Sequence, residues 1–288
     1  MPVVGTPSTS ASSAAFSIVT ARNLYATLDE ANTVLGTSGQ DADVMAVLDA
    51  ASRIAEQWSG REFYSITETR YIDVRGYYEA VLPDCLGVTE VLRDTYGLGE
   101  FPDTLTEDTE FVLRPYTSWP KTSIYMLPEG KEHLTTGPRK LKVTGTWGAG
   151  DLSRQSPWHD PGVTVTLASA ADTTATLSAA NGVAAGHTLL VGTEQLFVES
   201  VSELEATVAR GVNGTTAAAH AADDAYSAAY PPDVTRGVLW LASEIWRAHA
   251  QAGYESERIG EYSYKMASGD KADYMRARLF GRVRRAVV

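Results

Sequence analysis

The sequence has a single cysteine, no long apolar run and fewer basic than acidic residues. With 24 Lys and Arg against 36 Asp and Glu, the 288-residue chain carries a formal net charge of −12. Each phosphate contact needs a Lys or Arg, so this balance argues against a protein that grips nucleic acid mainly through its phosphates. DNA can still pass close by without being held.

The lone cysteine, Cys85, excludes an intramolecular disulfide and a cysteine-based zinc site. We expect a buried, inert thiol in a protein made in a reducing cytosol. No basic residue precedes Arg22, and the start of the chain has no sustained apolar run, which argues against a secretory signal. No apolar stretch reaches about 18 residues, so a membrane span is not expected.

Recognisable catalytic motifs are also missing, including the nucleophile elbow, the His-Glu-x-x-His zinc motif and the phosphate-binding glycine loops. Asp41-Ala-Asp43 and Asp223-Asp224 supply only two carboxylates each, which favours first-turn acids of a helix and a solvated turn over cation sites. We therefore predict no enzyme, no cofactor and no metal. A catalytic assembly would need acids to converge in the fold with the five scattered histidines, His133, His159, His187, His220 and His249.

Three segments carry helical signals. Thr27 and Glu30 form a capping box, which predicts a short helix ending near Gly36. Residues 41–59 place apolar side chains at three- and four-residue steps before Gly60. Pro231-Pro232 opens a third amphipathic segment that ends near Gly253, and we expect it to pack against the helix at 41–59.

Apolar residues alternate with polar ones through much of the remaining first half, which predicts an antiparallel meander. Its expected strands are 66–74, 87–93, 110–113, 123–127 and 139–145. Residues 161–230 differ in composition, with 18 alanines and a net charge of −6 from one basic and seven acidic residues. Four short β-like runs there, at 163–167, 187–191, 195–198 and 204–208, predict a small all-β module.

The C-terminal end is basic. Five arginines occur among the last 13 residues without any acid: Arg276, Arg278, Arg282, Arg284 and Arg285. Either a solvated tail or a segment that docks on an acidic partner fits this pattern, because arginine pairs bidentately with carboxylates.

Four motifs in a fixed order carry a resemblance. They are Ala50–Arg61 (AASRIAEQWSGR), Leu141–Gly148 (LKVTGTWG), Pro232–Val238 (PDVTRGV) and Ile259–Tyr264 (IGEYSY). Together they resemble the head-tail connector (adaptor) proteins of tailed double-stranded DNA phages and gene transfer agents. The resemblance covers about 25–150 and 231–265, and the chain departs from it at 151–230, where most members run almost directly from Trp-Gly into Pro-Pro-Asp-Val.

The resemblance implies an α+β fold, a helical bundle with an antiparallel β part, into which a small all-β domain is inserted here. We accordingly expect an N-terminal arm at 1–22 that is flexible, an adaptor core at 23–150 and 231–265, the inserted domain at 151–230 and a basic C-terminal arm at 266–288.

The implied function is structural: a ring, commonly of twelve subunits, at the head-tail junction of the virion, assembled in the host cytoplasm. Its partners would be further copies of itself, the portal protein and a tail-side neck or tail terminator protein, with no membrane. DNA would leave through the lumen during ejection without specific binding. Contact with the portal would fall to Ile259, Tyr262, Tyr264, Arg276, Arg278, Arg282, Arg284 and Arg285.

A different class of function is a cell-surface or carbohydrate-binding β protein on a helical base. A sugar-binding platform needs exposed aromatic side chains, yet residues 161–230 contain only Phe197, Tyr226 and Tyr230. The composition of this module therefore weakens the carbohydrate hypothesis.

Overall fold

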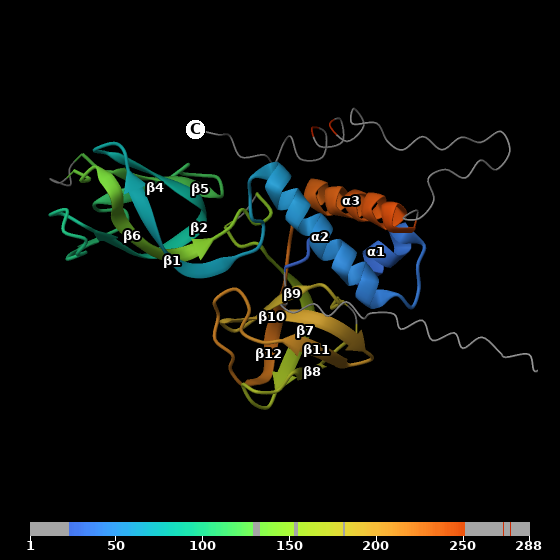
Figure 1. The fold of residues 1–288 in the computed structure, drawn as a ribbon. Helices are drawn as coiled ribbons and strands as arrows, with labels where there is room; N and C mark the ends of the chain where they lie inside the picture. Colours follow the sequence, from blue (N-terminus) through green and yellow to red (C-terminus); the bar gives the residue numbers. More distant parts are fainter. Residues whose placement is uncertain are drawn as a thin grey trace, which may run out of the picture.

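The computed structural model describes residues 23–128, 133–152, 155–180 and 182–250, together with Asp273 and Ala277. These residues form a layer of helices, an open β-sheet and a β-barrel (Figure 1). The helices are α1 (Leu28–Leu35), α2 (Asp41–Ser59) and α3 (Pro232–Ala250). None of them is long and apolar enough to span a membrane.

Both helices predicted in the first 60 residues are confirmed. The Thr27 hydroxyl accepts a hydrogen bond from the Glu30 amide at 3.2 Å, and the Glu30 carboxylate accepts one from the Thr27 amide at 2.8 Å. Gly36 and Gly60 end α1 and α2 with φ of 67° and 68°, a left-handed conformation that glycine adopts at little cost.

Helix α3 packs against α2 as the sequence predicts. Val234, Val238 and Ala242 of α3 share one buried core with Val44, Leu48 and Ala51 of α2. The same core takes in Phe63, just after α2, and Phe197 of the barrel. The helical layer therefore gains part of its apolar burial from the β regions on which it rests.

The first sheet is antiparallel, with the strand order β1-β6-β2-β5-β4 and β3 paired to β2. Its strands are β1 (Ile66–Val74), β2 (Glu79–Arg93), β3 (Asp103–Leu105), β4 (Phe111–Arg114), β5 (Lys121–Met126) and β6 (Gly137–Trp147). One face encloses a core of its own around Trp147, Phe111 and Leu141, all at most 1% exposed. Cys85 lies in this core, and burial raises the pKa of its thiol to about 11.

The next six strands close into a barrel in the order β10-β11-β8-β7-β12-β9. They are β7 (Trp158–Leu167), β8 (Thr174–Leu177), β9 (Thr188–Val191), β10 (Glu194–Ser202), β11 (Glu205–Ala209) and β12 (His220–Ala228). Alternate residues such as Val163, Val165 and Leu167 point inward and are buried. A barrel of this size has no lumen, because its inward side chains fill it.

The barrel is tied to both other parts by a buried polar network. Asn23, just before α1, exchanges two hydrogen bonds of 2.8 Å with Asn213 and accepts a third from Thr188 at 3.0 Å. Gln195 donates to the Ser65 carbonyl at 3.0 Å, next to the start of β1. Asn23, Thr188 and Gln195 are buried, so losing one of their hydrogen bonds would leave a buried polar group unsatisfied. This cost holds the barrel in place.

The expected fold class, a helical bundle with an antiparallel β part and an inserted small all-β domain, is wrong, because the protein is mostly β. Among the described residues there are three helices against twelve strands, and the strands build a sheet and a closed barrel that each have their own core. The three helices of the described residues, two of them long, form one layer, and their core also takes in Phe63 and, from the barrel, Phe197. The segments in which apolar and polar residues alternate therefore determine the architecture.

One further expectation is wrong, and three strands have no counterpart among the predicted ones. Asp223 and Asp224 lie within strand β12 and not in a turn, and Asp223 contacts His220 at 2.9 Å. Strands β3, β8 and β12 were not predicted from the sequence.

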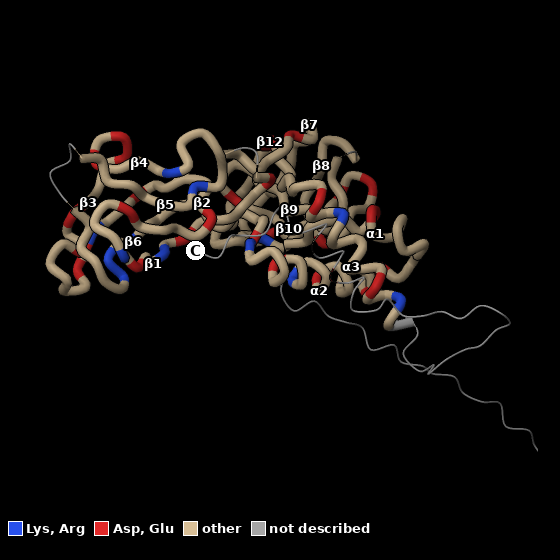
Figure 2. The backbone as a smooth tube through the Cα atoms, turned by 90° about the horizontal axis from the view of Figure 1, so that it is seen from above, with Lys and Arg blue, Asp and Glu red and all other residues tan. Residues whose placement is uncertain are grey.

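Figure 2 shows that acidic positions are spread over the sheet, the barrel and the helices.

Candidate functional site

Three of the four motifs that carry the resemblance lie within the described residues, and they come together in space. The first ends α2 at Gly60 and Arg61, and the second ends at Gly148, just after β6. Gly60, Arg61 and Gly148 line one pocket, which we call the junction pocket. The third motif opens α3, whose Val234 packs in the same core as Ala55 of α2. The fourth motif lies outside the described residues.

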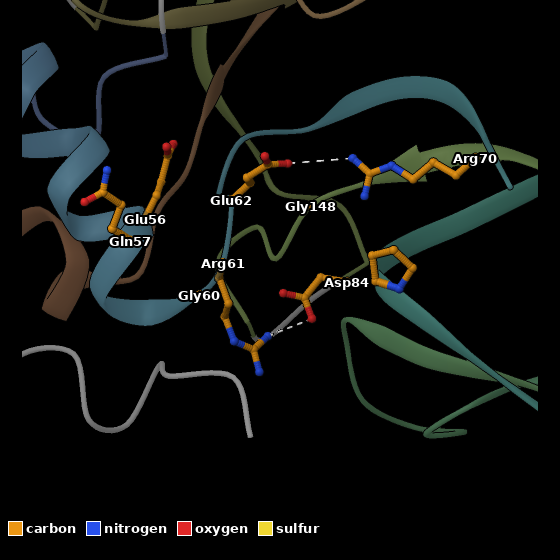
Figure 3. Close-up of a pocket in the computed structure, with 9 residues that line it drawn as sticks. Glu56, Gln57, Gly60, Arg61, Glu62, Arg70, Asp84 and Gly148 are labelled. Carbon is orange, nitrogen blue, oxygen red and sulfur yellow. Dashed lines mark hydrogen bonds and ion pairs between the residues drawn. The ribbon is translucent and has the colours of Figure 1, made fainter. Parts of the chain in front are cut away.

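The junction pocket has a volume of 410 Å³ and separates the end of α2 from the first sheet (Figure 3). Its remaining lining residues are Glu56, Gln57, Glu62, Arg70, Pro83 and Asp84. Arg61 pairs with Asp84 across the pocket at 3.0 Å, and Arg70 approaches Glu62 at 3.7 Å. The two ion pairs connect the loop that follows α2 to strands β1 and β2.

Each cation of the junction pocket already has an anionic partner. Arg70 also pairs with Glu68 at 2.6 Å and lies 4.9 Å from the Trp147 ring centroid. Burial raises the pKa of Glu56, which accepts a hydrogen bond from the buried Tyr25 hydroxyl. Because these charges are balanced locally, the pocket is suited to hold the helix against the sheet and not to attract an anion.

Gly148 allows the close approach on which this junction depends. Its φ is 134°, and a Cβ atom added there would lie 2.0 Å from the Tyr64 carbonyl oxygen. Its amide donates to the Asp84 carbonyl at 2.9 Å, and the next amide, of Ala149, donates to the Glu62 carbonyl at 2.8 Å. The Trp-Gly pair of the second motif therefore has a direct structural role at this contact.

A second cluster of charged side chains lies in the barrel, and no spacing in the sequence indicates it. We call Glu194, Arg210, His220 and Asp223 the barrel ion cluster. Both Glu194 oxygens accept from Arg210 at 2.8 Å, and His220 contacts Glu194 through Nε2 and Asp223 through Nδ1, each at 2.9 Å. Glu194 is 0% exposed. The amides of Gly211 and Ala218 also donate to it, at 3.0 and 2.9 Å.

This arrangement keeps Glu194 ionised. Burial by itself raises the pKa of Glu194, but the hydrogen bonds from Arg210, the Ala218 amide and His220 outweigh it and lower the pKa to about 2. A carboxylate this saturated is a poor proton acceptor near neutral pH. Its geometry instead fixes the segment from Arg210 to Ala218, which includes the Asn213 contact to the rest of the protein.

The described residues bear on the metal-binding and carbohydrate-binding hypotheses. No group of three or more His, Cys, Asp or Glu side chains in the described ranges is arranged to hold a metal ion. Asp41 and Asp43 lie in the first turn of α2, as expected for helix N-terminal acids. Of the barrel aromatics, Phe197 is buried at 3% exposure and Tyr230 packs edge-on against Tyr25 at 4.8 Å, so neither offers an open stacking platform.

The residues expected to contact a portal all lie outside the described residues. These are Ile259, Tyr262, Tyr264, Arg276, Arg278, Arg282, Arg284 and Arg285. Their role therefore stays a prediction.

The strands and loops of the first sheet carry several exposed apolar side chains, which the sequence reasoning did not single out. Residues 71–116 hold seven large apolar side chains that are at least 45% exposed: Tyr71, Tyr77, Tyr78, Val81, Tyr96, Leu98 and Tyr116. The Arg139 guanidinium stacks on the Tyr71 ring at 4.2 Å. Exposed tyrosines beside arginines are typical of surfaces that bind other proteins.

Comparisons of the chain with protein-family models, with curated proteins and with solved structures each found no match.

Proposed function

We propose that the protein is a structural head-tail adaptor of a phage-like particle, a ring-forming subunit that joins the portal to the tail and lets DNA pass. The observation that carries this proposal is the ordered set of four motifs, 50–61, 141–148, 232–238 and 259–264. The first and second of them meet at the junction pocket between α2 and the first sheet, and the third packs against α2 in the helical core.

The surface chemistry is compatible with this role. A net charge of −12 disfavours tight phosphate binding, so DNA in a channel lined by such subunits would slide and not adhere. Ring closure needs two different patches on each subunit, because a cyclic head-to-tail interface is heterologous. The exposed apolar side chains of residues 71–116 supply one candidate patch.

The test is attachment to the portal of the same particle. A variant in which all five arginines between 276 and 285 are replaced by Glu should fold normally and lose portal attachment, because the expected dock pairs these guanidinium groups with acids. Sedimentation of portal with each variant measures attachment, and circular dichroism checks the fold.

Arg236→Glu is the matched control, since Arg236 is exposed on α3 and is not among the residues expected to contact the portal. It should attach like the parent chain. Undiminished attachment of the five-fold variant would contradict the docking role of the arginines, and the absence of any portal binding by the parent chain would contradict the proposed function.

A further inference from the structure

An apolar groove lies between the end of α1, the first half of α2 and the end of α3. Figure 1 shows these three helices side by side. We call this groove the helix groove. Its volume is 760 Å³, and its lining residues are Leu35, Gly36, Thr37, Gln40, Asp43, Ala46, Val47, Ala50, Ile245 and Trp246. Among the residues that the structure describes, none of the barrel or the first sheet lines it.

The floor of the helix groove is an incomplete continuation of the helical core. Leu35, Val47, Ile245 and Trp246 pack against that core but remain only partly buried. A groove between helices that leaves aliphatic and indole side chains open is the kind of surface that receives the apolar face of another helix.

The chain itself continues from the edge of this groove. Trp246 lines it, and α3 ends one turn later at Ala250, after which 38 residues follow. Even a short part of such a length spans the groove, since an extended chain covers about 3.3 Å per residue. Because the segment is tethered, its effective concentration at the groove is roughly millimolar. Binding therefore does not require a large interface.

The sequence of this end has the pattern that the groove requires. Met275, Leu279, Val283 and Ala286 recur at steps of four, four and three, which puts them on one face at helical spacing. Asp273 and Ala277, which are four residues apart, are both helical. An apolar stripe of about three turns matches helix-in-groove recognition, in which the anchors are spaced by three or four residues.

Charge favours the same occupant. Asp43, which is exposed in the first turn of α2, lines the groove, and the exposed Asp41 precedes it by two residues. Residues 274–288 contain five arginines and no acid. At helical spacing Arg278, Arg282 and Arg285 lie beside the apolar stripe and not within it, so the stripe can face the groove while arginines remain at its border.

We propose that the helix groove binds the chain's own C-terminal segment, residues 272–287, as an amphipathic helix whose apolar stripe is Met275, Leu279, Val283 and Ala286. This contact goes beyond the proposed adaptor function and does not depend on it. It completes the helical layer with a fourth helix and positions the basic end next to α1 and α2.

The first experiment is cysteine cross-linking in the full chain. Ala50→Cys, at an exposed position of the groove, is combined with Leu279→Cys, and Cys85 is retained because it is buried. Mild oxidation should give an intramolecular disulfide. Leu98→Cys with Leu279→Cys is the control, because Leu98 is 74% exposed on the first sheet, and this pair should not cross-link. A disulfide between two copies, or none, would overturn the proposal.

The second experiment uses maleimide labelling of Ala50→Cys. Changing Leu279 and Val283 to Ser removes two stripe positions but no charge, and it should accelerate labelling about tenfold, which corresponds to about 1.4 kcal/mol of docking free energy. Ala42→Cys is exposed on α2 but does not line the groove, and its labelling rate should not change. Equal labelling of Ala50→Cys in both backgrounds would contradict the proposal.

Discussion

Substitution of Glu194 by Gln is the sharpest perturbation of the barrel ion cluster. Gln has nearly the same shape as Glu, so the change removes a charge and one acceptor without opening a cavity. Glu194 accepts two hydrogen bonds from Arg210, one from His220 and two from backbone amides. The variant leaves Arg210, whose side chain is only 8% exposed, without its carboxylate.

Two independent arguments give the size of the effect. Removing one partner of a buried ion pair costs about 3–5 kcal/mol, because the remaining charge is desolvated and unpaired. The pKa of Glu194 falls from 4.5 to about 2, and a difference of this size corresponds to about 3 kcal/mol at neutral pH. We therefore expect Glu194→Gln to lower the free energy of unfolding by about 3 kcal/mol.

The pH dependence follows from the direction of this shift. A carboxyl group with a lowered pKa in the folded state stabilises the protein above its unfolded pKa, and this contribution is lost as the pH falls toward the folded value. Glu194 thus contributes a loss of stability between pH 4.5 and about 2. Glu194→Gln should lack this part of the slope.

Urea unfolding followed by circular dichroism measures both effects. Glu205→Gln is the control, because Glu205 is exposed on the neighbouring strand β11, and it should change the free energy of unfolding by less than about 0.5 kcal/mol. The reasoning is refuted if Glu194→Gln behaves like this control at pH 7, or if both variants retain the same acid slope as the parent chain.

Three further predictions concern the junction and the cores. Gly148→Ala should destabilise the protein by more than about 2 kcal/mol, because the added Cβ would overlap a backbone carbonyl. Gly99→Ala is the control, since Gly99 also has a positive φ but open space around it, and it should cost about 1 kcal/mol. Thermal unfolding compares the two variants. Asn23→Ala removes three hydrogen bonds, of which the one from Thr188 is buried and the two with Asn213 are partly buried. It should cost about 1–3 kcal/mol and increase barrel motion, which amide relaxation measures; unchanged dynamics would argue against a rigid attachment. Cys85 should not react with a thiol reagent at pH 8 until the protein is unfolded in denaturant, because burial raises the pKa of its thiol to about 11. Rapid reaction of the native protein would contradict the burial of Cys85.

Local sequence signals predicted the elements that local chemistry determines. The capping box at Thr27 and the terminating Gly60 are confirmed, and Ile66–Val74 forms the predicted strand. Strand β12 escaped prediction because His220–Ala228 is rich in Ala and Asp, which have low strand propensity, and pairing with β7 and β9 supplies its stability. The predicted helical bundle was wrong because the resemblance gave the helices more weight than the segments in which apolar and polar residues alternate.

The sites illustrate a further limit of sequence reasoning. Glu194 and His220 are 26 residues apart, and closure of the barrel brings them into contact. Arg61 and Asp84 likewise meet because strand β2 returns beside the end of α2. A charge with its partner on another element has no characteristic spacing, so neither cluster had a signal in the sequence. The glycine at 148 did belong to a recognised motif, and its tight contact explains why that position requires glycine.

The most direct test of the adaptor function is electron microscopy of the assembled particle, with the chain located by fitting the sheet and the barrel into the density. The proposal predicts a ring of copies between portal and tail, around the path of the DNA. Density for the chain elsewhere on the particle, away from the head-tail junction, would contradict it.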